Sequence, residues 1–271
     1  MLLLTYLALV YINPQKTRLI FQFWSNVGII KVPTFLKDIM KKHCVLLHQR
    51  GPLRELVHQD RLFAQSLSSN EIGLRFYETH GIIFGKLDKA LSRFEEGRTW
   101  IESMGYPTTV REQGGLGVIV DEGVINVSLI LPATLLPYSG LYEAYDTMVM
   151  LLQKGLRHYH KKLQFYEITN SYCPGKYDGV IDGKKFCGIA QKRMKDRVII
   201  SATILVNQDQ THRGSIMKQF YDIANPNNDA KYPVIDPHSM ATLSDVLGHE
   251  ISTQDVHKAL FKSTKEWVES L

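Results

Sequence analysis

The stretch YDGVIDGKKFCGIAQ, residues 177–191, has the pattern of a β-hairpin. Its two arms, 177–181 and 185–191, are rich in the apolar and aromatic residues typical of strands. Between the arms stands Asp182-Gly183, a pair that favours the tight two-residue turn of an antiparallel hairpin. RVIISATILVN (197–207) follows as a nearly continuous apolar run, which predicts a further strand.

A second hairpin is predicted at GVIVDEGVINVSLILP (117–132), where β-branched runs flank an Asp-Glu-Gly loop. Three stretches have helical spacing of apolar residues: 87–105, 141–163 and 252–268. The last of them starts at Ser252, and Asp255 three residues later indicates a capping box. Hairpins interleaved with long helices predict an α+β domain with a largely antiparallel sheet flanked by helices. They exclude an all-parallel nucleotide-binding fold.

The composition is that of an ordinary globular protein, with 44% apolar and 22% charged residues in a chain of 271. Three cysteines, Cys44, Cys173 and Cys187, make an odd and sparse set. Such thiols are typical of a reducing compartment, so we expect a cytoplasmic protein. The spacing of cysteines and histidines does not indicate a zinc site, and we expect no metal.

The formal net charge of +5 does not predict a nucleic-acid partner. Residues 1–39 carry four basic side chains and one acidic side chain, a surplus of +3, which leaves +2 for the rest of the chain. That remainder is too small for a face that follows a phosphate backbone.

The N-terminus, MLLLTYLALVYI (1–12), is apolar but short. A membrane-spanning helix needs about 20 residues, and a secretory signal has a basic stretch before its apolar run, which is missing here. We therefore expect no membrane association. We expect residues 1–39 to be an extension outside a single working domain, 40–271, with Met40 as the natural start. The alternative is an ordinary buried N-terminal strand.

Two thiols compete as a candidate nucleophile. Cys173 precedes Pro-Gly in a turn, where a side chain can face a pocket, whereas Cys187 lies inside a predicted strand. Strand alternation places Cys187 on the same face as Lys185, which makes Cys187 the closer companion of that cation. For either thiol, packing as a small apolar residue is the alternative. A nucleophilic cysteine needs a nearby cation or dipole that favours its thiolate.

A glycine-rich segment is the other candidate site. In VREQGGLGVIVDEGVINVS (110–128), Gly114, Gly115 and Gly117 could let backbone amides approach an oxyanion or a phosphate. A tight bend is the alternative, and no Walker-type phosphate loop is present.

Together these segments resemble the lipoate–protein ligase and octanoyltransferase family, which shares its catalytic fold with biotin–protein ligases. The resemblance rests on R-x-x-G-G-L-x-V-x-x-D-x-G-V-x-N-x-S at 111–128 and Y-D-x-x-I-x-G-K-K-F-x-G-I-x-Q at 177–191. SYCPGKYD (171–178) and KYPVIDPHSMATLSDVL (231–247) resemble one branch, the amidotransferases of Gram-positive bacteria that use the glycine cleavage H protein. The similarity covers about residues 60–257.

The resemblance implies a function for several residues. The acyl-accepting cysteine of the branch falls on Cys173, and the lysine of the family falls on Lys185, which would favour the thiolate of Cys173. Substrate-binding positions fall on Arg111, Gly114 and Gly115 at the pocket wall, and on His80 in FYETHGIIFGKLD (76–88), which matches an early strand of the family. Cys187 departs from the small residue usual at its position.

The implied reaction moves an octanoyl or lipoyl group from a lysine of the H protein to a lysine of a lipoyl domain in a 2-oxoacid dehydrogenase complex. It would pass through a cysteine thioester and need no cofactor and no ATP. Two alternatives remain: an ATP-dependent lipoate–protein ligase, and a non-catalytic protein that binds lipoyl domains.

Overall fold

The computed structural model describes residues 9–10, 20–21, 42–136, 141–159 and 162–271. Within the expected extension, 1–39, these ranges include only Leu9–Val10 (β1) and Ile20–Phe21 (β2), which pair antiparallel. The expected boundary after residue 39 and the start at Met40 therefore lie outside the described residues. Among the helices in the described ranges, none is both long enough and apolar enough to span a bilayer.

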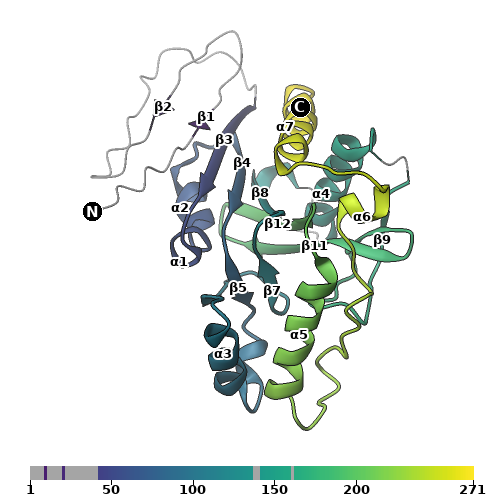
Figure 1. Ribbon diagram of the computed structural model, residues 1–271. Coiled ribbons are helices and arrows are strands. Elements are labelled where there is room, and N and C mark those ends of the chain that lie inside the picture. The colour runs from purple at the N-terminus through teal and green to yellow at the C-terminus, as the bar shows by residue number, and fades with distance from the viewer. Residues whose placement is uncertain (1–8, 11–19, 22–41, 137–140, 160–161) are drawn as a thin grey trace, which may run out of the picture.

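A seven-stranded sheet forms the centre of the molecule (Figure 1). In spatial order its strands are His43–Arg50 (β3), Glu71–Glu78 (β4), Val124–Pro132 (β8), Arg197–Leu205 (β12), Lys184–Arg193 (β11), Gly179–Ile181 (β10) and Gln164–Phe165 (β9). Strands β3 and β4 are parallel, and every other neighbouring pair in this sheet is antiparallel. The predicted largely antiparallel sheet is confirmed.

The hairpin predicted around Asp182-Gly183 is also confirmed. Both turn residues have positive φ, 49° and 76°, as a type I′ turn requires. The pairing of β10 with β11 is irregular: Lys185 lies opposite Val180, but Cys187 lies opposite Gly179. One residue of β11 is therefore extra, which is a β-bulge.

The second predicted hairpin, 117–132, is wrong in one respect. The turn exists, with Val124 N donating to Asp121 O at 3.1 Å, and β8 follows it. Val118–Val120 (β7), however, pairs with Gly81–Phe84 (β5) in a separate three-stranded sheet that Thr108–Val110 (β6) completes. The chain thus passes from the small sheet to the large one at this turn instead of folding back on itself.

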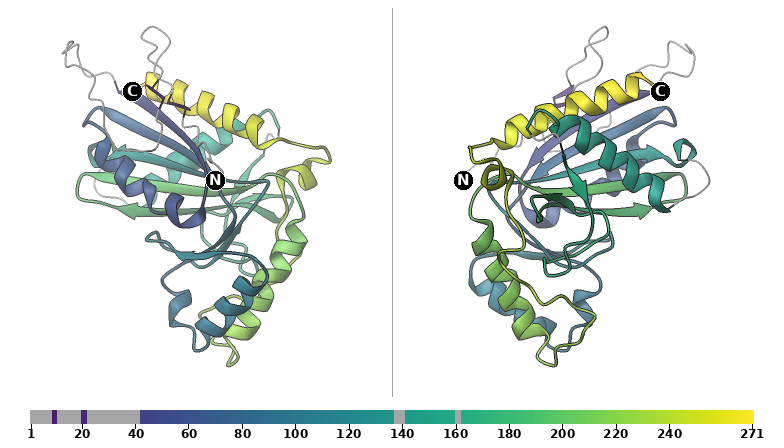
Figure 2. Two further views of the ribbon diagram at one scale, coloured as in Figure 1. Left: turned by 60° about the vertical axis from the view of Figure 1, so that its left-hand side comes forward. Right: turned by 90° about the vertical axis from the view of Figure 1, so that its right-hand side faces the viewer.

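Different helices pack against the large sheet and the small sheet. In order they are Leu53–Leu56 (α1), Gln59–Ser66 (α2), Phe94–Ser103 (α3), Leu141–Leu156 (α4), Gln210–Ala224 (α5), Leu243–Leu247 (α6) and Thr253–Glu269 (α7). Helices α4 and α7 lie side by side over one face of the large sheet, and their apolar side chains share a core with it (Figure 2). Helices α3 and α5 pack together against the small sheet at the other end of the molecule.

The helix predicted over 87–105 is interrupted. A 3₁₀ turn spans Asp88–Ala90, and α3 starts at Phe94. The cause is a buried carboxylate: Asp88 accepts hydrogen bonds from Gly85 N at 2.7 Å and Tyr221 Oη at 2.7 Å, so the chain turns inward there. The helix predicted over 141–163 is shorter than expected, since α4 ends at Leu156.

The predicted C-terminal helix is confirmed as α7. Ser252 Oγ accepts from Asp255 N at 3.1 Å, but the Asp255 carboxylate accepts from the Ser252 hydroxyl, so the reciprocal backbone bond of a capping box is replaced. A full capping box starts α6 instead, between Thr242 and Asp245.

Candidate active site

A cavity of about 230 Å³ lies between the two sheets. Alternate residues of the large sheet face it, among them Tyr77 on β4, Asn126 on β8 and Thr203 on β12. Ile83 on β5 and Val118 on β7 line it from the small sheet. The loop residues that complete its wall include Arg111, Gln113, Gly114, Gly115, Tyr172, Cys173, Pro174 and Gly175.

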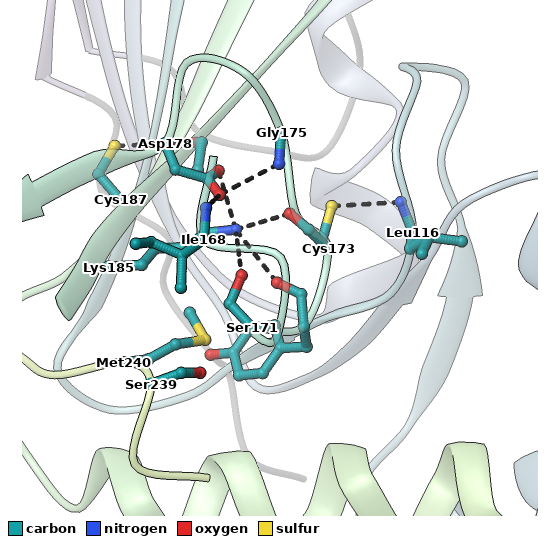
Figure 3. Close-up of polar contacts among 12 residues, drawn as sticks. Leu116, Ile168, Ser171, Cys173, Gly175, Asp178, Lys185, Cys187, Ser239 and Met240 are labelled. Carbon is teal, nitrogen blue, oxygen red and sulfur yellow. Dashed lines mark hydrogen bonds and ion pairs between the residues drawn. The ribbon is translucent and has the colours of Figure 1, made fainter. Parts of the chain in front are cut away.

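Cys173 is partly exposed to this cavity and is held by two donors. Its Sγ accepts from Leu116 N at 3.2 Å (Figure 3). It also accepts from Arg111 Nη2 at 3.4 Å. Its φ of 50° lies in the left-handed region, which is strained for a residue with a side chain. A backbone amide and a guanidinium are thus both aimed at one sulfur.

Gly115 allows the Arg111 guanidinium and the Cys173 thiol to lie close together against its backbone. A Cβ at this position would lie 2.7 Å from Arg111 Nη2 and 2.9 Å from Cys173 Sγ, and the φ of +95° also favours glycine. Gly85 is required behind it, since a Cβ there would lie 1.9 Å from Gly115 O. A Cβ at Gly114 would meet nothing within 4 Å. The glycine loop is therefore a close-approach element, with Gly115 as its critical position.

Lys185 is buried beside Cys173, but the partners of its ammonium group are oxygen atoms and not the Cys173 sulfur. Its Nζ donates to Cys173 O at 2.6 Å and to Tyr172 O at 3.1 Å, and it forms an ion pair with Asp178 Oδ1 at 2.9 Å (Figure 3). Burial raises the pKa of Asp178, and the Lys185 ammonium opposes that rise. The Asp178 carboxylate also accepts from Gly175 N at 3.1 Å. The pair thus fixes the backbone of the loop that carries the thiol.

Cys187 lies on the opposite side of the strand from this site, in contrast to the alternation argument. The bulge in β11 turns Cys187 into the core shared with α4 and α7, while Lys185 stays on the cavity side (Figure 3). The Cys187 side chain is fully buried, and burial raises the pKa of its thiol far above the ordinary value. It is a packed thiol.

The site uses groups that sequence reasoning did not single out. They are the Leu116 amide, Asp178 and Tyr145, which lines the cavity from α4. Asp178 stands in the Y-D pair of the 177–191 motif, which was the available signal. No sequence signal pointed to the other two groups. A backbone amide is present whatever the residue type, and Tyr145 lies in a helix far from this motif along the chain.

His80 is placed away from the cavity. It is exposed, and its ring stacks on Tyr106 at 4.7 Å between centroids. The cavity wall described above contains Arg111, Gly114 and Gly115 of the expected substrate-binding set, and His80 is not part of it.

The family model for the lipoyl protein ligase A/B catalytic domain matches residues 52–265. The chain belongs to this family. The expected fold, a lipoate and biotin ligase-like catalytic domain, is thereby confirmed.

Two bacterial relatives show which members of the family are similar. An octanoyl-[GcvH]:protein N-octanoyltransferase of Macrococcus caseolyticus is 40% identical over 68% of this chain and 66% of its own length. A lipoyl-[GcvH]:protein N-lipoyltransferase of Listeria monocytogenes is 33% identical over 70% of this chain and 69% of its own length. The chain thus spans about two thirds of the length of the relatives it matches.

A solved structure of lipoate-protein ligase A bound with ATP has a TM-score of 0.65 to this chain. It covers 84% of this chain and 85% of its own, at 20% sequence identity. At that identity the likeness shows the shared fold.

Proposed function

We propose that this family member is a cysteine-dependent acyltransferase. It would move an octanoyl or lipoyl group from a lysine of the glycine cleavage H protein to a lysine of a lipoyl domain in a 2-oxoacid dehydrogenase complex. One observation carries the proposal: the Cys173 sulfur lies in the cavity with a backbone amide and a guanidinium aimed at it. The names of the similar relatives support the cargo and the donor.

The reaction has two steps, and each balances without an oxidant or a nucleotide. The Cys173 thiolate attacks the amide carbonyl of the donor lysine, a C–S bond forms and the C–N bond breaks, and the proton that the thiol lost on ionising passes to the lysine nitrogen, which leaves as a neutral amine. The neutral amine of the acceptor lysine then attacks the thioester, a C–N bond forms and the C–S bond breaks, and the proton that the amine loses returns to the Cys173 sulfur. Since both ends are lysine amides, the overall free energy change is close to zero.

Arg111 and the Leu116 amide stabilise negative charge in this scheme. They face the sulfur in the resting enzyme, and Arg111 Nε is a buried donor without a hydrogen-bond partner. A buried donor without a partner is costly unless a ligand supplies one, and the oxyanion of the tetrahedral intermediate is such a ligand. We assign Lys185 and Asp178 to holding the Cys173 loop, and Gly115 to the close approach of the two segments.

The cavity suits an acyl chain of eight carbons. Its apolar wall includes Val57, Ile83, Val118, Leu205 and Met240. Burial at about 0.8 kcal/mol per methylene stabilises an octanoyl chain by up to roughly 5 kcal/mol. The printed names of the relatives include both octanoyl and lipoyl transfer, and we propose that either group fits.

The working domain and its compartment complete the proposal. We propose that residues 40–271 act as one acyltransferase domain, since the family match starts at residue 52 and extends to residue 265. The three cysteines are free thiols, which supports a reducing cytoplasm.

Intact-mass spectrometry of the purified protein, incubated with octanoylated H protein without ATP, tests the proposal. The wild type is expected to gain a hydroxylamine-sensitive octanoyl adduct, which Cys173→Ala removes and Cys187→Ala retains. Adding a lipoyl domain should then discharge the adduct and add the octanoyl group to the domain.

Other outcomes would overturn the proposal in identifiable ways. An adduct lost only in Cys187→Ala would move the nucleophile to the buried thiol. Modification of the lipoyl domain that requires ATP and free acid, without any adduct, would indicate the ATP-dependent ligase. Binding of the lipoyl domain with no modification under either condition would indicate a non-catalytic binding protein.

A further inference from the structure

Three tyrosine rings form a row that starts at the cavity wall and reaches the surface. Tyr145 lines the cavity and stacks on Tyr177, with ring centroids 4.6 Å apart and planes 12° apart. The ring centroid of Tyr177 in turn lies 6.4 Å from that of Tyr142, a residue that is 53% exposed. We call these three residues the tyrosine row.

The row joins the start of α4 to the loop that carries the thiol. Tyr142 and Tyr145 are three residues apart in α4, so their side chains project from the same side of the helix. Tyr177 lies four residues after Cys173. The Tyr145 hydroxyl is hydrogen-bonded to Gln191 on β11. The row is therefore held in place relative to the nucleophile by both flanking segments.

Charge is distributed unevenly along this path. The described cavity wall carries two cations, Arg111 and Lys185, and no aspartate or glutamate. At the row itself, burial and the nearby carboxylate of Asp146, an exposed residue of α4, raise the pKa of the Tyr177 hydroxyl. A protonated amine is attracted to the aromatic faces and to Asp146. Beside Arg111 and Lys185 the neutral amine is favoured, and that is the form that can attack a thioester.

We propose that the tyrosine row is the recognition surface for the lysine side chain of the protein substrate, a role that rests on the function proposed above. An extended lysine side chain reaches about 6 Å from Cα to Nζ. That length is comparable with a single ring spacing of the row, 4.6 Å or 6.4 Å, so the arm contacts two neighbouring rings at a time. The methylenes lie along the ring faces of Tyr177 and Tyr145, and the nitrogen enters the cavity that Tyr145 and Cys173 both line.

The test separates the lysine arm from the chemistry of the thioester. Octanoyl-Cys173 is prepared with p-nitrophenyl octanoate, which contains no lysine, and its decay is followed by intact mass. Two acceptors are compared over a range of concentrations: Nα-acetyl-lysine amide, which has the arm, and hydroxylamine, which does not. The variants are Tyr142→Ala, Tyr177→Ala and Tyr177→Phe, with Tyr166→Ala as the matched control because this tyrosine is 41% exposed and directly follows the neighbouring strand β9.

The alanine variants of the row are expected to raise the half-saturating concentration of the lysine compound about 3- to 10-fold, the range of a partly exposed cation–π contact. They should lower the ratio of the lysine rate to the hydroxylamine rate by a similar factor. Tyr177→Phe should recover most of the loss, since the ring face remains.

Two results would overturn the inference alone. One is an effect of the row variants no larger than that of Tyr166→Ala. The other is an equal loss with lysine and hydroxylamine, which would mean that the rings support the thioester or the fold. If the wild type forms no adduct with the ester, the proposed function fails, and this inference fails with it.

Discussion

At the scale of single residues, the two cations near Cys173 have different partners. Arg111 Nη2 lies 3.4 Å from the sulfur, whereas Lys185 Nζ binds the carbonyl of Cys173 and the buried Asp178. The sequence predicted that Lys185 would favour the thiolate directly. The structure instead aligns Arg111 with the sulfur and leaves Lys185 as an internal support of the loop.

This difference predicts separable effects of two substitutions. Arg111→Gln should slow alkylation of Cys173 by iodoacetamide about tenfold at neutral pH, since the thiolate loses its adjacent cation. Lys185→Gln should instead lower the free energy of unfolding by about 3 kcal/mol, because it leaves the Asp178 carboxylate buried without its partner. Alkylation rates and urea denaturation measure the two effects. The assignment would be wrong if Lys185→Gln slowed alkylation more than Arg111→Gln did in the folded protein.

At the scale of elements, the glycine loop between β6 and β7 offers a matched pair of positions. Gly115 has a φ of +95° and has no room for a Cβ, whereas nothing lies within 4 Å of a Cβ at Gly114. Gly115→Ala should therefore destabilise the protein by about 1–3 kcal/mol through backbone strain and the displaced thiol and guanidinium. Gly114→Ala should change stability by less than about 0.5 kcal/mol. Equal losses of unfolding free energy in the two variants would contradict this account of the loop.

Also at this scale, the turn residues predicted where the chain turns but not which strands pair. Asp182-Gly183 and the Asp121–Gly123 loop both form turns, but only the first joins two paired strands. Local residues set a turn, whereas the partner of each strand depends on which sheet its apolar face can enter. The bulge in β11 arises in the same way, from pairing with β10, and it reversed the expected facing of Cys187.

At the scale of the whole molecule, a histidine cluster ties the C-terminal helix to the edge of the large sheet. His257 of α7 lies against His48 of β3, 4.5 Å between ring centroids, and 3.8 Å from Glu78 of β4. Burial, together with repulsion by His48 and Arg50, lowers the pKa of His257 to about 4. Arg50 binds both oxygens of Glu78, so the carboxylate is already engaged in an ion pair.

The cluster predicts a stability that depends on pH. Because the folded pKa of His257 lies below its usual value of 6.5, the unfolded chain binds the extra proton first as the pH falls. This contribution is complete above pH 6.5 and is lost progressively toward pH 4, up to roughly 3 kcal/mol. Asp88 acts in the opposite sense, since its pKa is raised to about 6 by burial. The effect of His257 is therefore measured as the difference in the free energy of unfolding between the wild type and a His257 variant.

The free energy of unfolding of the wild type minus that of His257→Asn should rise by up to roughly 3 kcal/mol between pH 4 and pH 6.5. Urea denaturation at several pH values measures this difference. The exposed His249, changed in the same way, is the control. A difference that stays constant across this range would show that His257 titrates alike in both states.

The sequence by itself determined the family, the α+β class, the hairpin at 177–191 and the helix at the C-terminus. These follow from local periodicity, turn residues and contiguous motifs, which are properties of neighbouring positions. It also brought Cys173, Arg111 and Gly115 forward as site residues, and all three line one cavity. The cysteine–arginine contact, the carbonyl-bound lysine and the tyrosine row were decided only by the tertiary structure. Each depends on segments far apart in the chain, which are brought together by a bulge, a crossing between sheets and a helix whose Tyr145 lines the cavity, and no local pattern encodes those approaches.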